Sequence, residues 1–393
     1  MNGTIYMPVG EVCSSISDTY REKKNMVTLI NTSDVLEGRV LNHERVPNSN
    51  LKGQFKKTFQ RDDILYSEIR PQNRRFAYVD FSPIDYIAST KLMVIRAKKD
   101  VVSPKYLYYF LKNSSTVAEL QLLAETRSGT FPQITFSEVA NLTIPVPSLA
   151  VQEVIVQTMQ CLEDKITCNE QINDNLEQQA QSYFQELFVD NADPEWAIGT
   201  ISDLGTVVGG STPSKAKPEY YTESGIAWIT PKDLSINKSK FVSHGENDIT
   251  ELGLKNSSAA ITPEGTVLFS SRAPIGYIAI AAGEVTTNQG FKSVVPKPEI
   301  GTPFVYFFLK NTLPVIEGIA SGSTFKEVSG STMKNVPAVI PDAETLAKFS
   351  DFCAPIFAQQ RILEEQNQSL ATLRDNLLPK LMSGEIDVSA VQL

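Results

Sequence analysis

The chain contains few side chains in the arrangements that enzymes use. Residues 209–215 are rich in glycine and end in a lysine, but their spacing differs from the phosphate-cradling pattern G-x-x-x-x-G-K-[ST]. No Asn/Asp-Pro-Pro-aromatic tetrapeptide is present, and neither His43 nor His244 stands in a recognisable triad pattern. The sequence therefore predicts a protein with no catalytic site and no cofactor of its own. An enzyme with an unrecognised site is the alternative.

The four cysteines are not spaced as metal ligands or as a disulfide framework. No two of them form a C-x-x-C pair, and the chain has only two histidines. The N-terminus has no basic segment followed by an apolar one, and no apolar run is long enough to span a membrane. We therefore expect a cytoplasmic protein with reduced cysteines, no bound metal and no membrane contact.

Basic and small polar side chains instead gather where they suit contact with nucleic acid. Lys and Arg bind phosphates, whereas forked and amide side chains read the edges of bases. The candidates in the first half are Arg45, Lys52, Lys56, Lys57, Arg61, Arg70, Arg74 and Arg75. The candidates in the second half are Thr212, Ser214, Lys215, Lys217, Tyr221, Lys232, Lys238, Lys240 and Arg272.

Each of these candidates has a second interpretation. A solvated surface explains the lysines and arginines equally well, and residues 209–215 are also typical of a turn. Trp228 is expected to be packed in the core, or to form a shelf, rather than to stack on a base. Residues 288–290, Asn-Gln-Gly, fit a contact to DNA and the stabilisation of the loop beneath the contact surface equally well.

Two long helices are predicted to position these regions. Apolar or small side chains recur at steps of three or four over residues 149–189, with no Gly or Pro between Ser148 and Pro194. The pattern returns in residues 343–382, after Asp342. Ser148 and Asp342 are both favourable N-cap residues. Because each helix has one narrow apolar seam, we expect the two to pair antiparallel as a coiled coil.

The two seams contain mainly large apolar side chains. They consist of Ile155, Met159, Leu162, Ile166, Leu176, Ala180, Tyr183 and Leu187, and of Phe349, Ile356, Leu363, Leu370, Leu377 and Leu381. Asn169 and Asn173 fill the remaining stations of the first seam, where a buried Asn fixes register at a cost in stability. Pro379 is expected to kink or end the second helix near Leu378.

The globular parts repeat along with the helices. Residues 106–113 match residues 304–311, but residues 14–60 have no convincing counterpart in residues 203–260. This predicts an α+β protein with an internal pseudo-two-fold duplication, in which two strand-rich domains are joined by two long antiparallel helices. We expect strands at 62–67, 75–79, 92–95 and 142–147, and a helix at 105–113. The predicted domains are 1–148, a central helix 149–190, 191–341, and a C-terminal helix with its tail, 342–393.

The net charge of −9 is concentrated on the predicted helices, in a chain whose 393 residues are enough for two or three domains. Residues 151–190 have a net charge of −7 and residues 342–393 one of −4, which leaves +2 on the rest of the chain. The globular parts are therefore free to face phosphate. An ordinary solvated helix surface explains the acidic residues equally well.

The second half contains the more specific motifs. In chain order they are GGSTPSK at 209–215, GIAWITPKDL at 225–234, GTVLFSSRAPIG at 265–276, TNQGF at 287–291 and LLPKLMSGEI at 377–386. Together they resemble the DNA-specificity subunit of Type I restriction–modification systems, over nearly the whole chain. The first half departs from the resemblance, because it has no G-x-T-P-S element.

The resemblance implies a specific function. A subunit of this kind binds one double-stranded DNA target made of two short, different half-sites separated by a nonspecific gap. It also docks two methylation subunits and, for cleavage, two restriction subunits, which use S-adenosylmethionine, ATP and magnesium. The alternative function is a two-headed coiled-coil scaffold that binds proteins through its helices and does not bind DNA.

Overall fold

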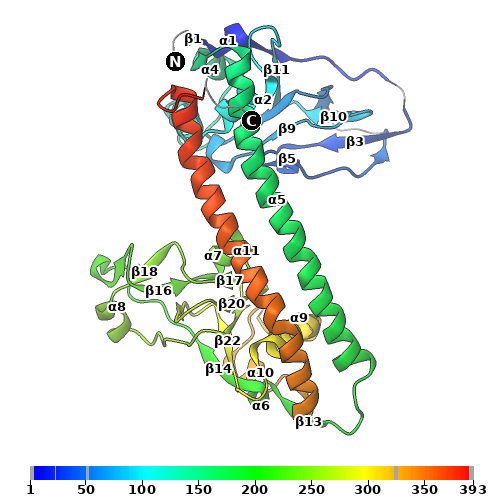
Figure 1. The fold of residues 1–393 in the computed structure, drawn as a ribbon, viewed down its shortest axis with the longest axis vertical. Coiled ribbons are helices and arrows are strands. Elements are labelled where there is room, and N and C mark those ends of the chain that lie inside the picture. The colour runs from blue at the N-terminus through cyan, green and yellow to red at the C-terminus, as the bar shows by residue number, and fades with distance from the viewer. Residues whose placement is uncertain (1–3, 23, 50–52, 323–325, 389–393) are drawn as a thin grey trace. The chain divides into compact units, whose positions relative to one another are not determined.

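The computed structural model describes residues 4–22, 24–49, 53–322 and 326–388. The chain divides into two compact units. Unit 1 comprises residues 1–166 and 369–393, and unit 2 comprises residues 167–368. The division falls inside the two longest helices, so each unit contains a globular part and one end of each helix (Figure 1).

Unit 1 is rich in short strands. These are β1 (Ile5–Pro8), β2 (Cys13–Ile16), β3 (Met26–Ile30), β4 (Val35–Leu36), β5 (Arg39–Val40), β6 (Val46–Pro47), β7 (Phe55–Lys57), β8 (Ile64–Ser67), β9 (Phe76–Tyr78), β10 (Tyr86–Ser89), β11 (Leu92–Ala97) and β12 (Thr143–Val146). Its helices are α1 (Val9–Val12), η1 (Thr32–Asp34), η2 (Pro71–Asn73), α2 (Pro104–Lys112), α3 (Ser114–Arg127), α4 (Phe136–Asn141) and the first part of α5 (Leu149–Gln185).

Two strongly apolar strands form the centre of one sheet of unit 1. β8 and β11 pair antiparallel with Leu92 opposite Ser67, and both strands are almost entirely buried. Short continuous apolar runs of this kind are typical of fully covered strands. The order of this sheet is β2-β11-β8-β9, a second sheet has the order β6-β3-β10-β7, and β1 pairs with β12.

The aromatic helix α2 lies at the centre of the largest core of unit 1. Its residues 106–111 are all buried. The same core contains Ile155 and Met159 from the start of α5 and Leu378 and Leu381 from the end of α11 (Ala343–Ser383). Because the start of one long helix packs with the end of the other, the two helices run antiparallel within unit 1.

Pro379 was predicted to kink or end the second long helix near Leu378, and the predicted end is wrong. α11 continues through Pro379 to Ser383. A proline inside a helix removes one backbone hydrogen bond and crowds the preceding turn. Leu381 and Met382, however, are 1% and 5% exposed and belong to the core of unit 1. Their burial offsets the cost of the proline and keeps the last turn helical.

Unit 2 repeats this plan with longer strands. These are β13 (Ala197–Thr200), β14 (Gly205–Gly209), β15 (Tyr221–Thr222), β16 (Ile226–Ile229), β17 (Phe241–Val242), β18 (Asn247–Ile249), β19 (Val267–Ser271), β20 (Ile275–Ala281), β21 (Thr286–Thr287), β22 (Lys292–Pro296) and β23 (Pro337–Ile340). Its helices, besides parts of α5 and α11, are η3 (Glu186–Asp190), α6 (Ile201–Leu204), η4 (Pro218–Tyr220), α7 (Pro231–Ile236), α8 (Glu251–Lys255), α9 (Thr302–Gly318) and α10 (Gly330–Lys334).

The core of unit 2 forms around α9, the counterpart of α2. Residues 304–309 of α9 are buried, together with Phe184 near the end of α5 and Phe349 and Cys353 near the start of α11. The two long helices are therefore antiparallel in unit 2 as well. The seam residue Asn169 is fully buried, and its Nδ2 donates to Asn367 Oδ1 of α11 over 2.8 Å.

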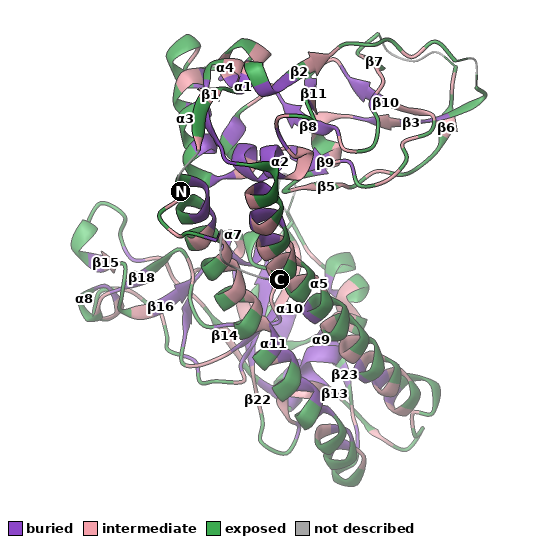
Figure 2. Ribbon diagram, turned by 45° about the horizontal axis from the view of Figure 1, so that its top comes forward, coloured by how far each residue is buried: buried purple, intermediate pink, exposed green. Residues whose placement is uncertain are grey.

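The predicted duplication is confirmed in the strand pairing of each unit. β13 pairs with β23 as β1 pairs with β12, and β19 lies beside β22 as β8 lies beside β11. β8 leads into a corner where Arg70 has a φ of 44°, and β19 leads into a corner where Ala273 has a φ of 50°. Both residues precede a proline. In Figure 2 the buried residues concentrate in the sheets, α2 and α9, whereas α5 and α11 keep an exposed face.

The strands and the short helix that the sequence predicted in the first half are all present, as β8, β9, β11, β12 and α2. Within the described parts of the chain, none of the helices combines the length and the hydropathy needed to cross a membrane.

Candidate nucleic-acid interface

A hollow of about 480 Å³ opens in unit 2 between the ends of several strands. It is lined by Thr212, Lys215, Trp228, Thr230, Pro231, Lys232, Asp233, Glu246, Asn247, Arg272, Ala273, Asn288, Gln289 and Gly290. Four candidates from the sequence, Thr212, Lys215, Lys232 and Arg272, thus come together although they are up to 60 positions apart. Three of them are cations, so the hollow suits an anionic ligand.

The glycine-rich segment on one side of the hollow is held by close backbone packing. Ser211 N donates to Thr287 O over 2.9 Å, and Trp228 Nε1 donates to Ser211 O over 3.0 Å. A Cβ atom on Gly210 would lie 2.2 Å from the backbone oxygen of Asn288. This position therefore requires glycine. Trp228 is 6% exposed, which confirms the prediction of a packed tryptophan.

The loop after β21 lines the hollow with residues 288–290. Asn288 N donates to Ile229 O over 3.0 Å, and Asn288 Oδ1 accepts from Gly290 N over 2.8 Å. Ser271 N donates to Gly290 O over 2.7 Å. Asn288 thus stabilises this loop, which is one of the two interpretations that its sequence allowed. Gln289 beside it is exposed.

The acidic side chains around the hollow already have partners. Lys232 lies 2.5 Å from Glu246, and this hydrogen bond raises the pKa of Lys232. Asp233 Oδ2 accepts from the backbone of Thr230 over 2.7 Å at the start of α7. Within the described ranges, no acidic side chain forms an ion pair with Lys215, which is exposed. Lys215 is therefore the cation best placed to meet a phosphate.

Other candidates of unit 2 lie outside the lining of the hollow. Ser214 and Lys217 are exposed on the same loop as Lys215, and Lys217 lies over the ring of Tyr220. The hydroxyl of Tyr221 donates to Pro213 O over 2.6 Å, and burial raises its pKa. Lys238 lies 4.5 Å from the centre of the Tyr277 ring. Tyr221 therefore supports the loop rather than facing a ligand with a free hydroxyl.

The structure removes Lys240 from the candidates for DNA contact. The residue is 7% exposed, and its Nζ lies 2.7 Å from Glu177 Oε2 and 3.5 Å from the centre of the Phe357 ring. Burial lowers the pKa of Lys240 to about 8. Its ammonium group is enclosed by α5, α9 and α11, so it does not reach a phosphate on the surface.

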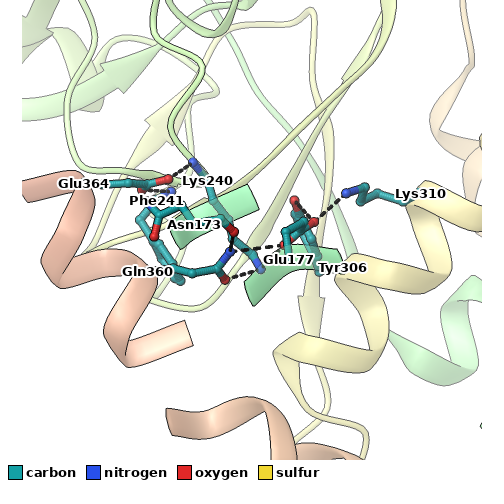
Figure 3. Close-up of polar contacts among 8 residues, drawn as sticks. All are labelled: Asn173, Glu177, Lys240, Phe241, Tyr306, Lys310, Gln360 and Glu364. Atoms are coloured by element: carbon teal, nitrogen blue, oxygen red, sulfur yellow. Dashed lines mark hydrogen bonds and ion pairs between the residues drawn. The ribbon is translucent and has the colours of Figure 1, made fainter. Parts of the chain in front are cut away.

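Lys240 belongs to a buried polar network, which Figure 3 shows. Besides Lys240, Glu177 accepts from Lys310 Nζ over 2.5 Å and from the hydroxyl of Tyr306 over 3.1 Å. Glu364 of α11 accepts from the backbone nitrogens of Lys240 and Phe241, over 2.7 and 3.0 Å. This network attaches the loop before β17 to the helices of unit 2.

Several candidates of unit 1 are bound to the protein itself. Arg45 donates to Met26 O (3.0 Å), Lys57 to Leu92 O (2.7 Å), Arg74 to Ser114 Oγ (2.9 Å) and Arg75 to Ser33 O (3.0 Å). Lys56, Arg61 and Arg70 are exposed, whereas Lys52 lies outside the described residues. A hollow of about 90 Å³ beside Arg74 also contains Lys112 and Arg374. Of the candidates of unit 1, Arg74 is the one that lines this hollow.

Comparison with known proteins identifies the family. The sequence model described as "Type I restriction modification DNA specificity domain" matches residues 6–178 and 194–373. The chain belongs to this family. The two matched segments correspond to the two copies of the internal duplication. As a specificity subunit, the chain is a non-catalytic component of a restriction–modification system.

Relatives and solved structures agree with this assignment. The chain is 29% identical to the Type I restriction enzyme HindI specificity subunit of Haemophilus influenzae, over 92% of this chain and 94% of that protein. It is 39% identical to the MjaIX specificity subunit of Methanocaldococcus jannaschii, over 47% and 45%. The crystal structure of the S subunit from M. genitalium has a TM-score of 0.53 at 16% identity, covering 97% of this chain and 96% of that one. The structural likeness supports the fold.

Sequence reasoning did not select every residue that lines the hollow of this specificity subunit. Glu246 precedes β18 and Asn247 is its first residue. Neither residue belongs to one of the motifs found in the sequence. They reach the hollow only because β18 pairs with β16, which places Asn247 opposite Trp228. Among the residues that the structure describes, no three His, Cys, Asp or Glu side chains are grouped as a metal site.

Proposed function

We propose that this chain recognises one asymmetric DNA target in two parts, one part with each unit. The hollow in unit 2 is the main support for this proposal. It combines exposed Lys215 with Arg272 and with the amides of Asn247 and Gln289, the side chains that contact phosphates and base edges. The lining contains charge for affinity and hydrogen-bonding groups for specificity.

The difference between the two units supports a target with two different halves. In unit 1, Lys57 of β7 donates to Thr90 O and Leu92 O, so β7 covers the start of β11. In unit 2 the corresponding start of β22 borders the hollow through Gln289 and Gly290. The two units therefore share one fold but expose different side chains at the start of β11 and of β22. Two such surfaces are suited to recognising two different DNA sequences.

We also propose that the chain docks two methylation subunits and two restriction subunits, and that the complex acts in the cytoplasm, where its DNA is. The duplication supports two copies of each partner subunit, because each of the two units contains one copy of the same fold. S-adenosylmethionine, ATP and magnesium would be used by those partners. The names of the relatives, which are specificity subunits of restriction enzymes, are consistent with such a complex.

Sequence-specific methylation by the assembled complex tests this function. Residues 198–341 are exchanged for the equivalent segment of a relative, and the methylated DNA is sequenced. The expected result is a change in one half of the target only. A change in both halves contradicts recognition in two separate parts. Binding to random duplex DNA that does not weaken with salt contradicts DNA recognition altogether, because phosphate contacts are salt-dependent.

A further inference from the structure

We propose that Gln289 reads an adenine in the half-site that unit 2 contacts, and that Thr212 sets the orientation of its carboxamide group. The proposal rests on the proposed function, because the ligand is DNA.

The hydrogen bonds of Gln289 match the edge of adenine. The Thr212 hydroxyl donates to Gln289 Oε1. The carboxamide oxygen has two acceptor sites and the nitrogen two hydrogens, so among the residues that the structure describes one acceptor and both donors are left for a ligand. Adenine presents the N6 amino donor and the N7 acceptor in the major groove, and a Gln side chain binds both at once. The bond from Thr212 therefore orients the group for this pairing.

The backbone beneath Gln289 is fixed in place. Its neighbour Asn288 is bonded to Ile229 O, and Gly290 O accepts from Ser271 N. A Cβ atom on Gly290 would lie 2.9 Å from Pro231, which leaves little room for a larger residue there. Because the loop has few alternative positions, Gln289 loses little freedom when it binds. Such preorganisation favours specificity.

Basic side chains line the same hollow as Gln289. Lys215 and Arg272 both line it, and Arg272 lies 3.6 Å from Glu327 while remaining partly exposed. Phosphate contacts from such residues fix the position of a protein on the duplex, and a base contact can then discriminate. Gln289 and Asn247, at the start of β18, are the amide side chains of the described lining that are exposed.

At the position that corresponds to Gln289, the first unit has Thr90, which has no amide side chain. The pair formed by Ser270 and Phe291 corresponds to the pair of Ser67 and Leu92. Counting back two residues from Phe291 and from Leu92 places Thr90 where unit 2 has Gln289. The backbone oxygen of Thr90 accepts from Lys57. We therefore assign this adenine contact to unit 2 alone.

The test uses the chain assembled with its methylation subunit, and methylation sequencing identifies the target. Gln289→Ala should make one A·T position of the second half-site degenerate, with discrimination there falling by roughly 5- to 150-fold, the range expected when a bidentate pairing to a base is removed. Gln289→Glu should shift the preference at that position toward cytosine, because a carboxylate accepts from the cytosine amino group.

Variants of Thr212 test whether its hydroxyl orients the carboxamide group of Gln289. Thr212→Val should relax the same position, whereas Thr212→Ser, which keeps the hydroxyl, should restore it. Gln60→Ala, an exposed amide in unit 1, serves as the control and should leave the second half-site unchanged.

Two results would overturn the assignment. One is an unchanged target for Gln289→Ala in an active complex. The other is a uniform loss of methylation with no change of preference at any position. A wild-type complex that methylates without sequence preference would instead overturn the proposed function, and this inference with it.

Discussion

The ammonium nitrogen of Lys240 lies 2.7 Å from Glu177 Oε2, so a residue of the loop before β17 forms a buried ion pair with the central helix α5. Lys310 of α9 binds the same carboxylate over 2.5 Å. In unit 1 the counterpart of Lys310, Lys112 of α2, likewise forms an ion pair with α5, at Glu163. In each unit, therefore, a lysine of the aromatic helix attaches the globular part to α5.

Lys240→Met should destabilise unit 2. The variant removes one partner of a buried ion pair and leaves Lys310 as the cation paired with Glu177. Breaking a buried pair costs about 3–5 kcal/mol, and Lys310 should reduce that to about 2–4 kcal/mol. Urea unfolding measures the difference. Lys232→Met, which breaks the exposed pair with Glu246, is the matched control and should change stability far less, because solvent screens an exposed pair. Equal losses of stability for the two variants would contradict a stabilising role for the buried pair.

The contribution of Lys240 to the free energy of unfolding should also depend on pH. Burial lowers its pKa from 10.5 to about 8 in the folded chain. Between these two values the unfolded chain binds more protons at this site, so the stability contributed by the site rises with pH. The free energy of unfolding of the wild type, minus that of Lys240→Met, should therefore increase from pH 8 to pH 10. A difference that is flat or falls over this window would show that folding does not lower the pKa of Lys240.

The network around Lys240 shows why the site was only partly predictable. The seam period and the matched segments predicted the long helices, their antiparallel pairing and the duplicated frame. In the sequence, Lys240 and Lys215 are both simply basic residues near loops. Only tertiary packing distinguishes them, because Lys240 precedes a strand that packs against α11, whereas Lys215 lies in a surface loop. Pro379 illustrates the same limit, since burial of Leu381 keeps its helix intact.

Lys215→Ala combined with Lys217→Ala should weaken binding to every DNA sequence. Both lysines are exposed beside the hollow, and phosphate contacts carry charge but little sequence information. The slope of log affinity against log salt should become shallower by up to about 1.8, or about 0.9 for each phosphate that is no longer neutralised. Lys255→Ala combined with Lys297→Ala removes the same charge from exposed positions that do not line the hollow. An identical decrease for both pairs would indicate a general charge effect rather than contact at the hollow.

Asn169→Leu should stabilise unit 2 and loosen the register of its helix pair. Asn169 is completely buried, and its Oδ1 has no hydrogen-bond partner among the described residues, although its Nδ2 binds Asn367. A buried polar seam residue costs stability, and it fixes register because every shifted pairing leaves it unbonded. Leucine removes that cost, and we expect a gain of about 1–2 kcal/mol in urea unfolding. Hydrogen exchange in the part of α5 that belongs to unit 2 should meanwhile become faster or heterogeneous. Asn175→Leu, at an exposed position of the same helix, should produce neither change. If Asn169→Leu destabilises the unit instead, the bonds from its Nδ2 to Asn367 and Gln366 outweigh the buried, unpaired oxygen, and Asn169 stabilises the seam as well as setting its register.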